Sequence, residues 1–365
     1  MTVFSQLIQS FVDDVGSRRK VRSAASIEKF HSWVQAQPKV ETHVHLEAGV
    51  APGFYESLNR PNTWSSSYPW QRAPFANLRE FIMAWVDLSR SIRTPSDVEA
   101  LAESFVASRV PQNIRYTEAY FSPADLSFMR RRFQIAPEIF DFSEVLHAYV
   151  RGLKRGLAAH PGFEVRLVMD ALWPSTADER LEMKTVLRQS LESNDFFDAQ
   201  GRPLIVAIGL GGSESHHDLE GHREFVNDVR ALGFKIDIHS GEGNTVEMHR
   251  TSVETLSPDR VAHGFVGVQS GYLFGSNVVM CPLSNLLLKT FSGRAEDHPA
   301  FRLLREDVPI LIGSDDPLLL GHDLSAEFSF IYAIEESFDE SKFLQIQENT
   351  RKRVFAPGVC EQVLS

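Results

Sequence analysis

The feature that most constrains the fold of this chain is an alternation of short apolar segments with longer stretches of helical periodicity. Segments such as Leu204 to Leu210 are apolar at nearly every position, which is typical of strands buried on both faces of a parallel sheet. Eight strands are expected, at Val40 to Leu46, Arg115 to Phe121, Val165 to Met169, Leu204 to Leu210, Lys235 to His239, Arg260 to His263, Asn277 to Cys281 and Val308 to Ile312. Helical patterns separate them, for example at Phe142 to Leu157, Arg180 to Ser193, Glu220 to Leu232 and Ala326 to Glu335. This order predicts an α/β fold, a (β/α)8 TIM barrel, although an open doubly wound sheet also fits the pattern.

Two segments lie outside the alternation. Residues 1–37 repeat apolar side chains at helical spacing, and we expect them to form a helical cover over one end of the core. Residues 48–112 contain no good strand, so we expect a helical insertion that could act as a lid. Its irregular part, Asn59 to Pro74, and the residue after it are rich in aromatic side chains, which either line a pocket or pack the segment down: Trp64, Tyr68, Trp70 and Phe75. No linker interrupts residues 1–365, so a single domain is predicted.

Composition narrows the class of protein. The net charge of −11 argues against nucleic acid or an anionic membrane surface as the main partner, and the longest basic cluster, Arg130-Arg131-Arg132, is expected on a solvated helix face. The N-terminal residues lack the order of a secretory signal, and no apolar run is long enough to span a bilayer. Cys281 and Cys360 are too few for a disulfide framework and are expected to be buried. A cytoplasmic location is therefore expected.

Polar residues collect where the expected strands end. His43 and His45 lie two apart in the first strand, so both imidazoles project to the same side. By itself the pair fits a metal site or two incidental histidines about equally well. Further polar residues follow later strands: Glu118, Asp170, Ser213, Glu214, His239, Glu242, His263, Ser284, Asn285, Asp315 and Asp316. In a closed barrel these positions meet at the carboxyl-terminal face, where barrel active sites lie.

Three imidazoles and one carboxylate suit a zinc ion with room for a water molecule, and the candidates are His43, His45, His239 and Asp315. Proton transfer could fall to Glu242, His263 and Asp316. Glu242 could instead cap a helix that begins after Gly243, and the two aspartates could be a solvated turn. Four further histidines near strand ends could have no role: His216, His217, His249 and His322.

These motifs resemble a known family. The sequences that carry the resemblance are His43-Val44-His45-Leu46, Arg115-Tyr116-Thr117-Glu118, Phe121-Ser122-Pro123, Ser240-Gly241-Glu242 after His239, His263-Gly264, Cys281-Pro282-Leu283-Ser284-Asn285 and Ser314-Asp315-Asp316-Pro317. In this order, from Pro38 to Leu320, they resemble the adenosine and adenine deaminase family of the metal-dependent amidohydrolase superfamily. The resemblance implies a (β/α)8 barrel, one zinc ion per chain and hydrolytic loss of ammonia from C6 of a purine.

The resemblance also implies residue roles. Zinc would be bound by His43, His45, His239 and Asp315. Glu242 would protonate the ring nitrogen, while His263 and Asp316 would position and deprotonate the water. Substrate contacts are expected from His45, Glu47, Gly212 and Asp316, with Gly212 offering its backbone N–H. The absence of lysine from the fourth strand favours one metal over two, and two distant cysteines exclude the other class of zinc deaminase.

Two departures from the family pattern concern the substrate. Members that act on adenosine usually have Asp-Gly after His-x-His-Leu, whereas this chain has Glu47-Ala48-Gly49, which looks more like the branch acting on adenine or modified adenine nucleosides. The fourth-strand loop of the family usually reads Asp-Leu-Ala-Gly-Asp-Glu, whereas this chain reads Gly209-Leu210-Gly211-Gly212-Ser213-Glu214. The loss of both aspartates makes ordinary ribose recognition doubtful.

The sequence therefore predicts a zinc-dependent deaminase of adenosine or a related adenine nucleoside. Alternatives are a deaminase of free adenine and an amidohydrolase that deaminates another amino-substituted heterocycle. A metal-binding protein without catalysis is a third reading, against which the intact set of Glu242, His263 and Asp316 argues. The expected partner is a small molecule, and the pattern carries no information on oligomeric state.

Overall fold

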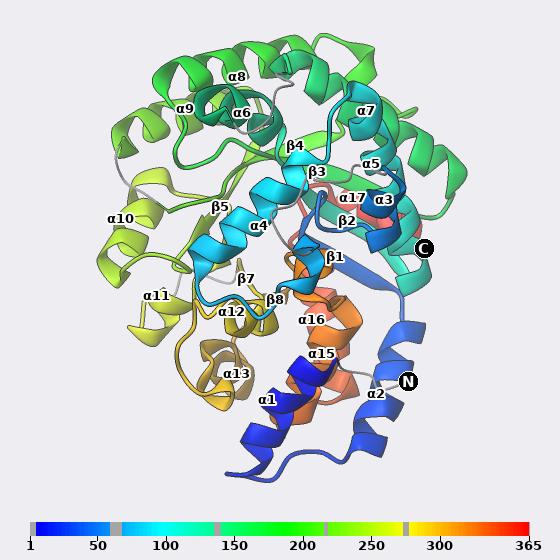
Figure 1. Ribbon diagram of the computed structural model, residues 1–365, viewed down its shortest axis with the longest axis vertical. Coiled ribbons are helices and arrows are strands. Elements are labelled where there is room, and N and C mark those ends of the chain that lie inside the picture. Colours follow the sequence, from blue (N-terminus) through cyan, green and yellow to red (C-terminus); the bar gives the residue numbers. More distant parts are fainter. Residues whose placement is uncertain (1–4, 59–67, 135–139, 215–217, 273–276, 365) are drawn as a thin grey trace.

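The computed structural model describes residues 5–58, 68–134, 140–214, 218–272 and 277–364, which form a parallel eight-stranded sheet with the strands in sequence order (Figure 1). The strands are β1 Lys39–His45, β2 Ile114–Phe121, β3 Glu164–Asp170, β4 Ile205–Leu210, β5 Lys235–Ser240, β6 Arg260–His263, β7 Val278–Met280 and β8 Leu311–Ile312. A parallel bridge between Val44 and Asp315 brings the first strand beside the end of the last. The predicted (β/α)8 barrel is confirmed, and the doubly wound alternative is wrong.

The last two strands are shorter than expected. The eighth begins at Leu311 rather than Val308, because Pro309 has no N–H to donate to the ladder. The seventh ends at Met280, since Pro282 begins the next helix directly after Cys281.

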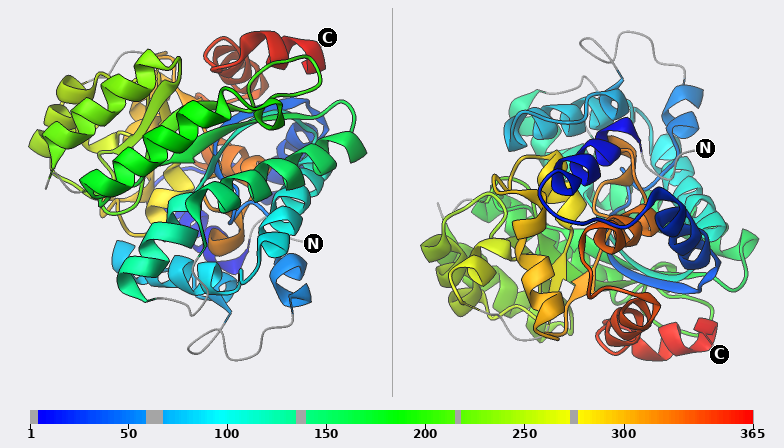
Figure 2. Two further views of the ribbon diagram at one scale, coloured as in Figure 1. Left: turned by 90° about the horizontal axis from the view of Figure 1, so that it is seen from above. Right: turned by 90° about the horizontal axis from the view of Figure 1, so that it is seen from below.

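Helices follow most strands, as expected. They are α7 Phe142–Ala159, α8 Ala177–Ser190, α9 Leu219–Ala231, α10 Val246–Leu256, α11 Phe265–Gln269, α12 Pro282–Leu287, α13 Pro299–Arg305, α14 Pro317–Leu320 and α15 Leu324–Ile334. Thr176 begins α8 with a reciprocal capping box to Glu179, which satisfies two backbone N–H groups at the helix start. The C-terminal helices α16 Glu340–Arg351 and α17 Pro357–Leu364 lie together at one edge of the molecule (Figure 2).

The helices at the N-terminus are α1 Gln6–Gly16 and α2 Ala24–Ala36, both of which pack against α15. Phe30 of α2 stacks on Tyr332 of α15 with ring centroids 4.0 Å apart. The Arg22 guanidinium also lies over the Tyr332 ring, 4.0 Å from its centroid. Their role as a cover for one end of the core stays a prediction.

The insertion between β1 and β2 is helical, as expected. It contains α3 Pro52–Ser57, α4 Leu78–Arg90 and α5 Pro95–Arg109, and Figure 1 shows α4 crossing in front of the strands. Trp64, from the irregular loop, lies outside the described residues. The segment is held down by packing, since Phe75 is buried and Tyr68 stacks on Trp70 at 4.8 Å between centroids.

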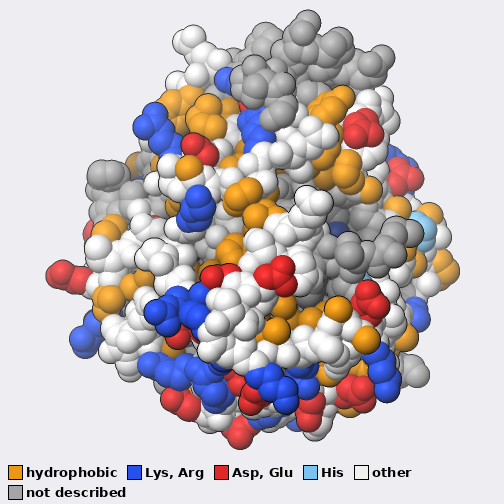
Figure 3. Space-filling model, turned by 60° about the horizontal axis from the view of Figure 1, so that its bottom comes forward, with side chains coloured by type: hydrophobic (Ala, Val, Ile, Leu, Met, Phe, Trp, Pro, Cys, Tyr) orange, Lys and Arg blue, Asp and Glu red, His pale blue; other side chains and the backbone are white. Residues whose placement is uncertain are grey.

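The charged surface differs from expectation in one place. Arg130 is fully buried; its guanidinium donates to the Ser89 carbonyl and lies over the Phe140 ring, so the basic triplet is not simply a solvated face. On the side of the molecule seen in Figure 3, acidic and basic side chains are intermixed. Cys281 and Cys360 are both buried and unpaired, as expected. Within the described ranges no helix combines the length and apolarity needed to cross a membrane, and the cytoplasmic location stays a prediction.

Candidate active site

The site begins where β1 and the end of β8 meet. The backbone N–H of His45 donates to the Asp315 carbonyl at 2.8 Å, and the N–H of Asp315 donates to the His43 carbonyl at 3.2 Å. Gly313 permits this approach, because a Cβ there would lie 2.6 Å from the His43 carbonyl oxygen. Two segments far apart in sequence thus hold three candidate ligands against one another.

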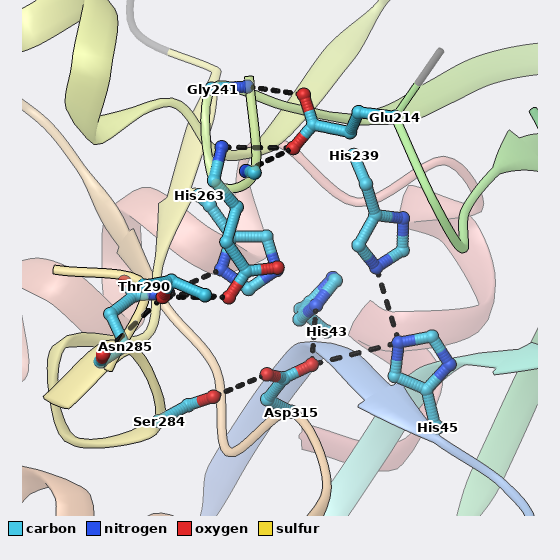
Figure 4. A network of polar contacts seen from close by, with 12 residues as sticks. His43, His45, Glu214, His239, Gly241, His263, Ser284, Asn285, Thr290 and Asp315 are labelled. Carbon is cyan, nitrogen blue, oxygen red and sulfur yellow. Dashed lines mark hydrogen bonds and ion pairs between the residues drawn. The ribbon is translucent and has the colours of Figure 1, made fainter. Parts of the chain in front are cut away.

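The four predicted metal ligands converge. Potential ligand atoms of His43, His45, His239 and Asp315 all lie within 4.8 Å of one another, and all four residues are buried. His43 Nε2 lies 3.1 Å from Asp315 Oδ1, and His45 Nε2 lies 3.1 Å from His239 Nε2 (Figure 4). Three imidazole nitrogens and a carboxylate oxygen directed at one buried point fit a divalent cation of the zinc type.

Electrostatics favour the ligating forms of these groups. Burial lowers the pKa of His45 to about 3 and holds the pKa of His239 well below its ordinary value, so both imidazoles are neutral. Burial alone would raise the pKa of Asp315, but its hydrogen bond with His43 and the nearby histidines hold it well below the ordinary value. His45 and His239 can therefore offer lone pairs to a cation, and the Asp315 carboxyl group is held in its ionised form.

Two of the site residues have left-handed backbone conformations. His263 has φ = 65° and Asp315 has φ = 61°, a region that non-glycine residues seldom adopt. Strained backbone of this kind concentrates at functional sites, where the surroundings hold it in place. At both positions it turns the chain sharply at the end of a strand.

Glu242 and His263 form a pair beside the ligands, 3.5 Å apart. The Asn285 side-chain amide donates to Glu242 Oε1 at 2.9 Å and lies 3.1 Å from His263 Nδ1. Burial raises the pKa of Glu242 to about 7. Burial by itself would lower the pKa of His263, but Glu242 and Asp315 raise it overall. Near neutral pH the pair can therefore hold and exchange a proton.

The loop that carries Glu242 is held by Glu214. The Glu214 carboxylate accepts hydrogen bonds from the backbone N–H groups of Gly241, Glu242 and Gly243 at 2.9, 2.9 and 2.8 Å (Figure 4). Helix α10 begins only at Val246 and is capped by Thr245, so the alternative that Glu242 caps this helix is wrong. Sequence reasoning assigned no role to Glu214, although its place after β4 marked it as polar.

Asp316 lies beside Asp315 and is buried, not solvated, so the alternative of a solvated turn is wrong. Its Oδ1 has no hydrogen-bond partner among the described residues. Burial and the neighbouring Asp315 carboxylate hold the pKa of Asp316 well above its ordinary value. On the other side, Ser284 Oγ donates to Asp315 Oδ2 at 2.5 Å, a contact that sequence reasoning did not foresee.

A cavity of about 500 Å³ opens over these residues. His45, His239, Asp315, Glu242, His263 and Asp316 line its floor, Gly212 lines one wall, and apolar side chains of α4 such as Phe81, Ile82 and Trp85 line another. Glu47 lies behind this cavity in a small adjoining space, where its carboxylate accepts hydrogen bonds from Tyr149 Oη at 2.5 Å and the Ser122 N–H at 2.8 Å. The structure thus brings every predicted site residue to one face, with Glu47 one layer further out.

The remaining histidines have other places. His249 Nδ1 lies 3.0 Å from Ser240 Oγ, and His322 Nε2 lies 3.1 Å from Glu327 Oε2. His216 and His217 lie outside the described residues. Of the described aromatic residues in the insertion, Phe81 and Trp85 reach the cavity, whereas Tyr68, Trp70 and Phe75 do not.

Comparisons with known proteins agree with this geometry. The model of the family described as adenosine deaminase matches residues 38–364. Similar curated proteins include adenine deaminases of Streptomyces coelicolor, 28% identical over 78% of this chain and 80% of that protein, and of Pseudomonas savastanoi, 26% identical over 83% and 92%.

Solved structures share the fold. An adenine deaminase from Arthrobacter aurescens superposes with a TM-score of 0.71 at 20% identity, covering 90% of this chain and 98% of that one. The N6-methyl-AMP deaminase of Arabidopsis thaliana gives 0.71 at 17% identity over 92% and 97%, and an amidohydrolase from Burkholderia ambifaria with bound zinc gives 0.70 at 19% identity over 95% and 96%. Fold, site and family match agree: the chain belongs to the adenosine deaminase family of the metal-dependent amidohydrolases, hydrolases that remove the amino group of a purine.

Proposed function

We propose that this protein is a zinc-dependent hydrolase, with one zinc ion per chain, that deaminates adenosine or a related adenine nucleoside. The observation that carries the proposal is the convergence of three imidazoles and the Asp315 carboxylate beside Glu242, on the floor of the cavity. A cavity of about 500 Å³ exceeds what a bare purine ring needs and leaves room for a sugar.

Zinc would be held by His43, His45, His239 and Asp315, and the bound zinc of the Burkholderia ambifaria neighbour supports that choice of metal. When bound, a zinc ion lowers the pKa of water towards neutrality and so makes hydroxide accessible at physiological pH. Glu242, which keeps a proton near neutral pH, delivers it to the ring nitrogen beside C6. This prevents negative charge from building up on the ring during attack.

The other polar groups orient the reactants. His263 and Asp316 hold the attacking water and accept its proton, and Asn285 keeps His263 and Glu242 in position. Gly212 would offer its N–H to the ring from the wall of the cavity, and His45 would contact the substrate from the floor. Glu47 lies behind the cavity and accepts a hydrogen bond from the N–H of Ser122, a residue of the cavity wall, so it would act on the substrate through that wall. This set of proton-handling groups is also the argument against a protein that only binds metal.

Free adenine is a second candidate substrate. It is favoured by the curated relatives, which are described as adenine deaminases, and by Glu47 in place of the aspartate usual in members that act on adenosine. Another amino-substituted heterocycle, such as a pterin, would use the same metal ligands and proton-transfer residues. It would differ from a purine in its contacts with the walls of the cavity.

The test is a comparison of three purified proteins. The natural chain should carry about one zinc by elemental analysis and release ammonia from one member of a panel of aminopurines and pterins. His239→Ala should lose zinc, whereas Glu242→Gln should keep zinc and lose turnover by about 100- to 10,000-fold. Full zinc occupancy in His239→Ala would overturn the ligand assignment, and undiminished turnover in Glu242→Gln would overturn the proton donor.

A further inference from the structure

Asp170 is a buried carboxyl group in the cavity wall that the proposed chemistry does not use. It ends β3, is 2% exposed and lines the cavity over the metal site. Backbone N–H groups of Gly211 and Leu172 approach its carboxylate, but Oδ1 has no hydrogen-bond partner among the described residues. A buried acceptor without a partner is costly, and Asp170 is a residue of the cavity wall, so a ligand held in the cavity is the group available to complete it.

The neighbouring strand is adapted to this side chain. A Cβ at Gly211 would lie 2.3 Å from Asp170 Oδ2, and a Cβ at Gly209 would lie 3.3 Å from Asp170 Oδ1. The carboxyl group from β3 therefore occupies the space beside these two glycines of β4 and the residue after it, which make room for it.

The surroundings of Asp170 are acidic. Asp125 lines the same cavity and accepts a hydrogen bond from Trp85 Nε1 at 2.9 Å. Burial and the nearby Asp125 and Glu47 carboxyl groups hold the pKa of Asp170 well above its ordinary value. Among the described residues that line the cavity, Arg90 is the only Lys or Arg, and it is paired with Asp87 at 2.9 Å. This wall therefore offers carboxyl oxygens to a hydrogen-bond donor, and its described residues provide no unpaired cation to neutralise a phosphate group.

We propose that Asp170 is a specificity-determining residue that accepts a hydrogen bond from a non-phosphorylated aminopurine, from the ring N–H of a free base or a hydroxyl of a nucleoside, and that discriminates against nucleotides. The proposal rests on the proposed function, since it places the purine over the same metal site.

The test measures binding to the zinc-loaded protein by calorimetry. The probes are purine, purine riboside and purine riboside 5′-monophosphate, which lack the 6-amino group and so are not consumed. The natural protein should bind purine or its riboside about 10- to 100-fold more tightly than the monophosphate. Asp170→Asn keeps the shape and replaces one carboxyl oxygen with an amide donor, so it should weaken binding of the preferred probe by about the same factor and reduce the ratio between its affinity and that of the monophosphate. Asp178→Asn, at an exposed position on α8, is the control and should change nothing.

Each outcome has one meaning. Equal affinity of the natural protein for the three probes, no binding of any of them, or an unchanged preference in Asp170→Asn with zinc retained would overturn the role of Asp170. Selective binding of purine riboside without release of ammonia from adenosine or adenine would overturn the proposed function and leave the binding role standing. The purine and riboside arms tell whether a ring N–H or a sugar hydroxyl is the donor.

Discussion

At the scale of single residues, Ser284 illustrates how side chains outside the ligand set control the site. Its hydroxyl donates to Asp315 Oδ2, leaving Oδ1 directed at the imidazoles. Removing a hydrogen bond that orients a ligand commonly reduces metal affinity by about 10- to 100-fold, so Ser284→Ala should bind zinc that much more weakly in competition with a chelator. Ser292→Ala, at an exposed position beyond the same helix, should bind zinc as the natural protein does. An unchanged affinity in Ser284→Ala would show that Asp315 is oriented by the backbone alone.

The same scale shows what the sequence could and could not predict. His43, His45, His239 and Asp315 were identifiable because each falls at the end of an apolar strand, and strand ends meet in a barrel. The tasks of Glu214 and Asn285 were not, because they depend on which backbone N–H or side-chain atom each faces after folding. The periodicity of apolar residues indicates which side of a strand a residue occupies, but it carries no information on contacts between loops.

At the scale of elements, α4 forms the apolar side of the cavity. Three of its side chains there are Phe81, Ile82 and Trp85, and the Trp85 ring lies 5.5 Å from the ring of the candidate ligand His45. The sequence predicted a helical insertion over residues 48–112, yet could not place its helices, because a helix with one apolar stripe can cover any apolar surface. Its position over the barrel mouth depends on the turns before and after it.

If residues 48–112 act as a lid, bound ligand should stabilise α4. Backbone amides of Leu78–Arg90 that exchange by local opening should then slow by up to about 100-fold when purine riboside is present at about 100 times its Kd, because the opened helix no longer completes the site. Hydrogen exchange followed by mass spectrometry gives this directly. Helix α8, on the outside of the barrel, is the internal reference and should exchange at the same rate with and without ligand. Equal exchange of α4 in both states would show that the insertion is a fixed wall.

At the scale of the whole molecule, the two ends of the barrel have different tasks. The carboxyl ends of the strands hold the site, whereas the interior nearer the amino ends holds a buried ion network centred on Arg260, the first residue of β6. Its guanidinium contacts Glu118 of β2 at 2.6 Å and Asp237 of β5 at 2.7 Å, so it joins strands across the barrel. The expectation that Glu118 lies at the carboxyl-terminal face is therefore wrong, because this side chain lies within β2 and pairs with Arg260. Burial by itself would lower the pKa of Arg260, but the two carboxylates raise it overall. The centroid of the Phe355 ring lies 4.0 Å from the guanidinium carbon, and the backbone N–H of Phe355 donates to Glu118. These contacts connect the C-terminal segment to the same network.

This division predicts a change that affects stability without affecting the site. Arg260→Met leaves two buried carboxylates without their cation, and breaking a buried pair in this way costs about 3–5 kcal/mol of unfolding free energy. Urea denaturation should show that loss, while the folded fraction keeps its zinc, because the ligands lie at the other ends of the strands. The triple variant Glu118→Gln, Asp237→Asn and Arg260→Met removes every charge together and should recover much of the loss, since no uncompensated ion remains. If the single and triple variants are equally unstable, the network acts through packing of the long Arg260 side chain, and charge pairing across the barrel contributes little.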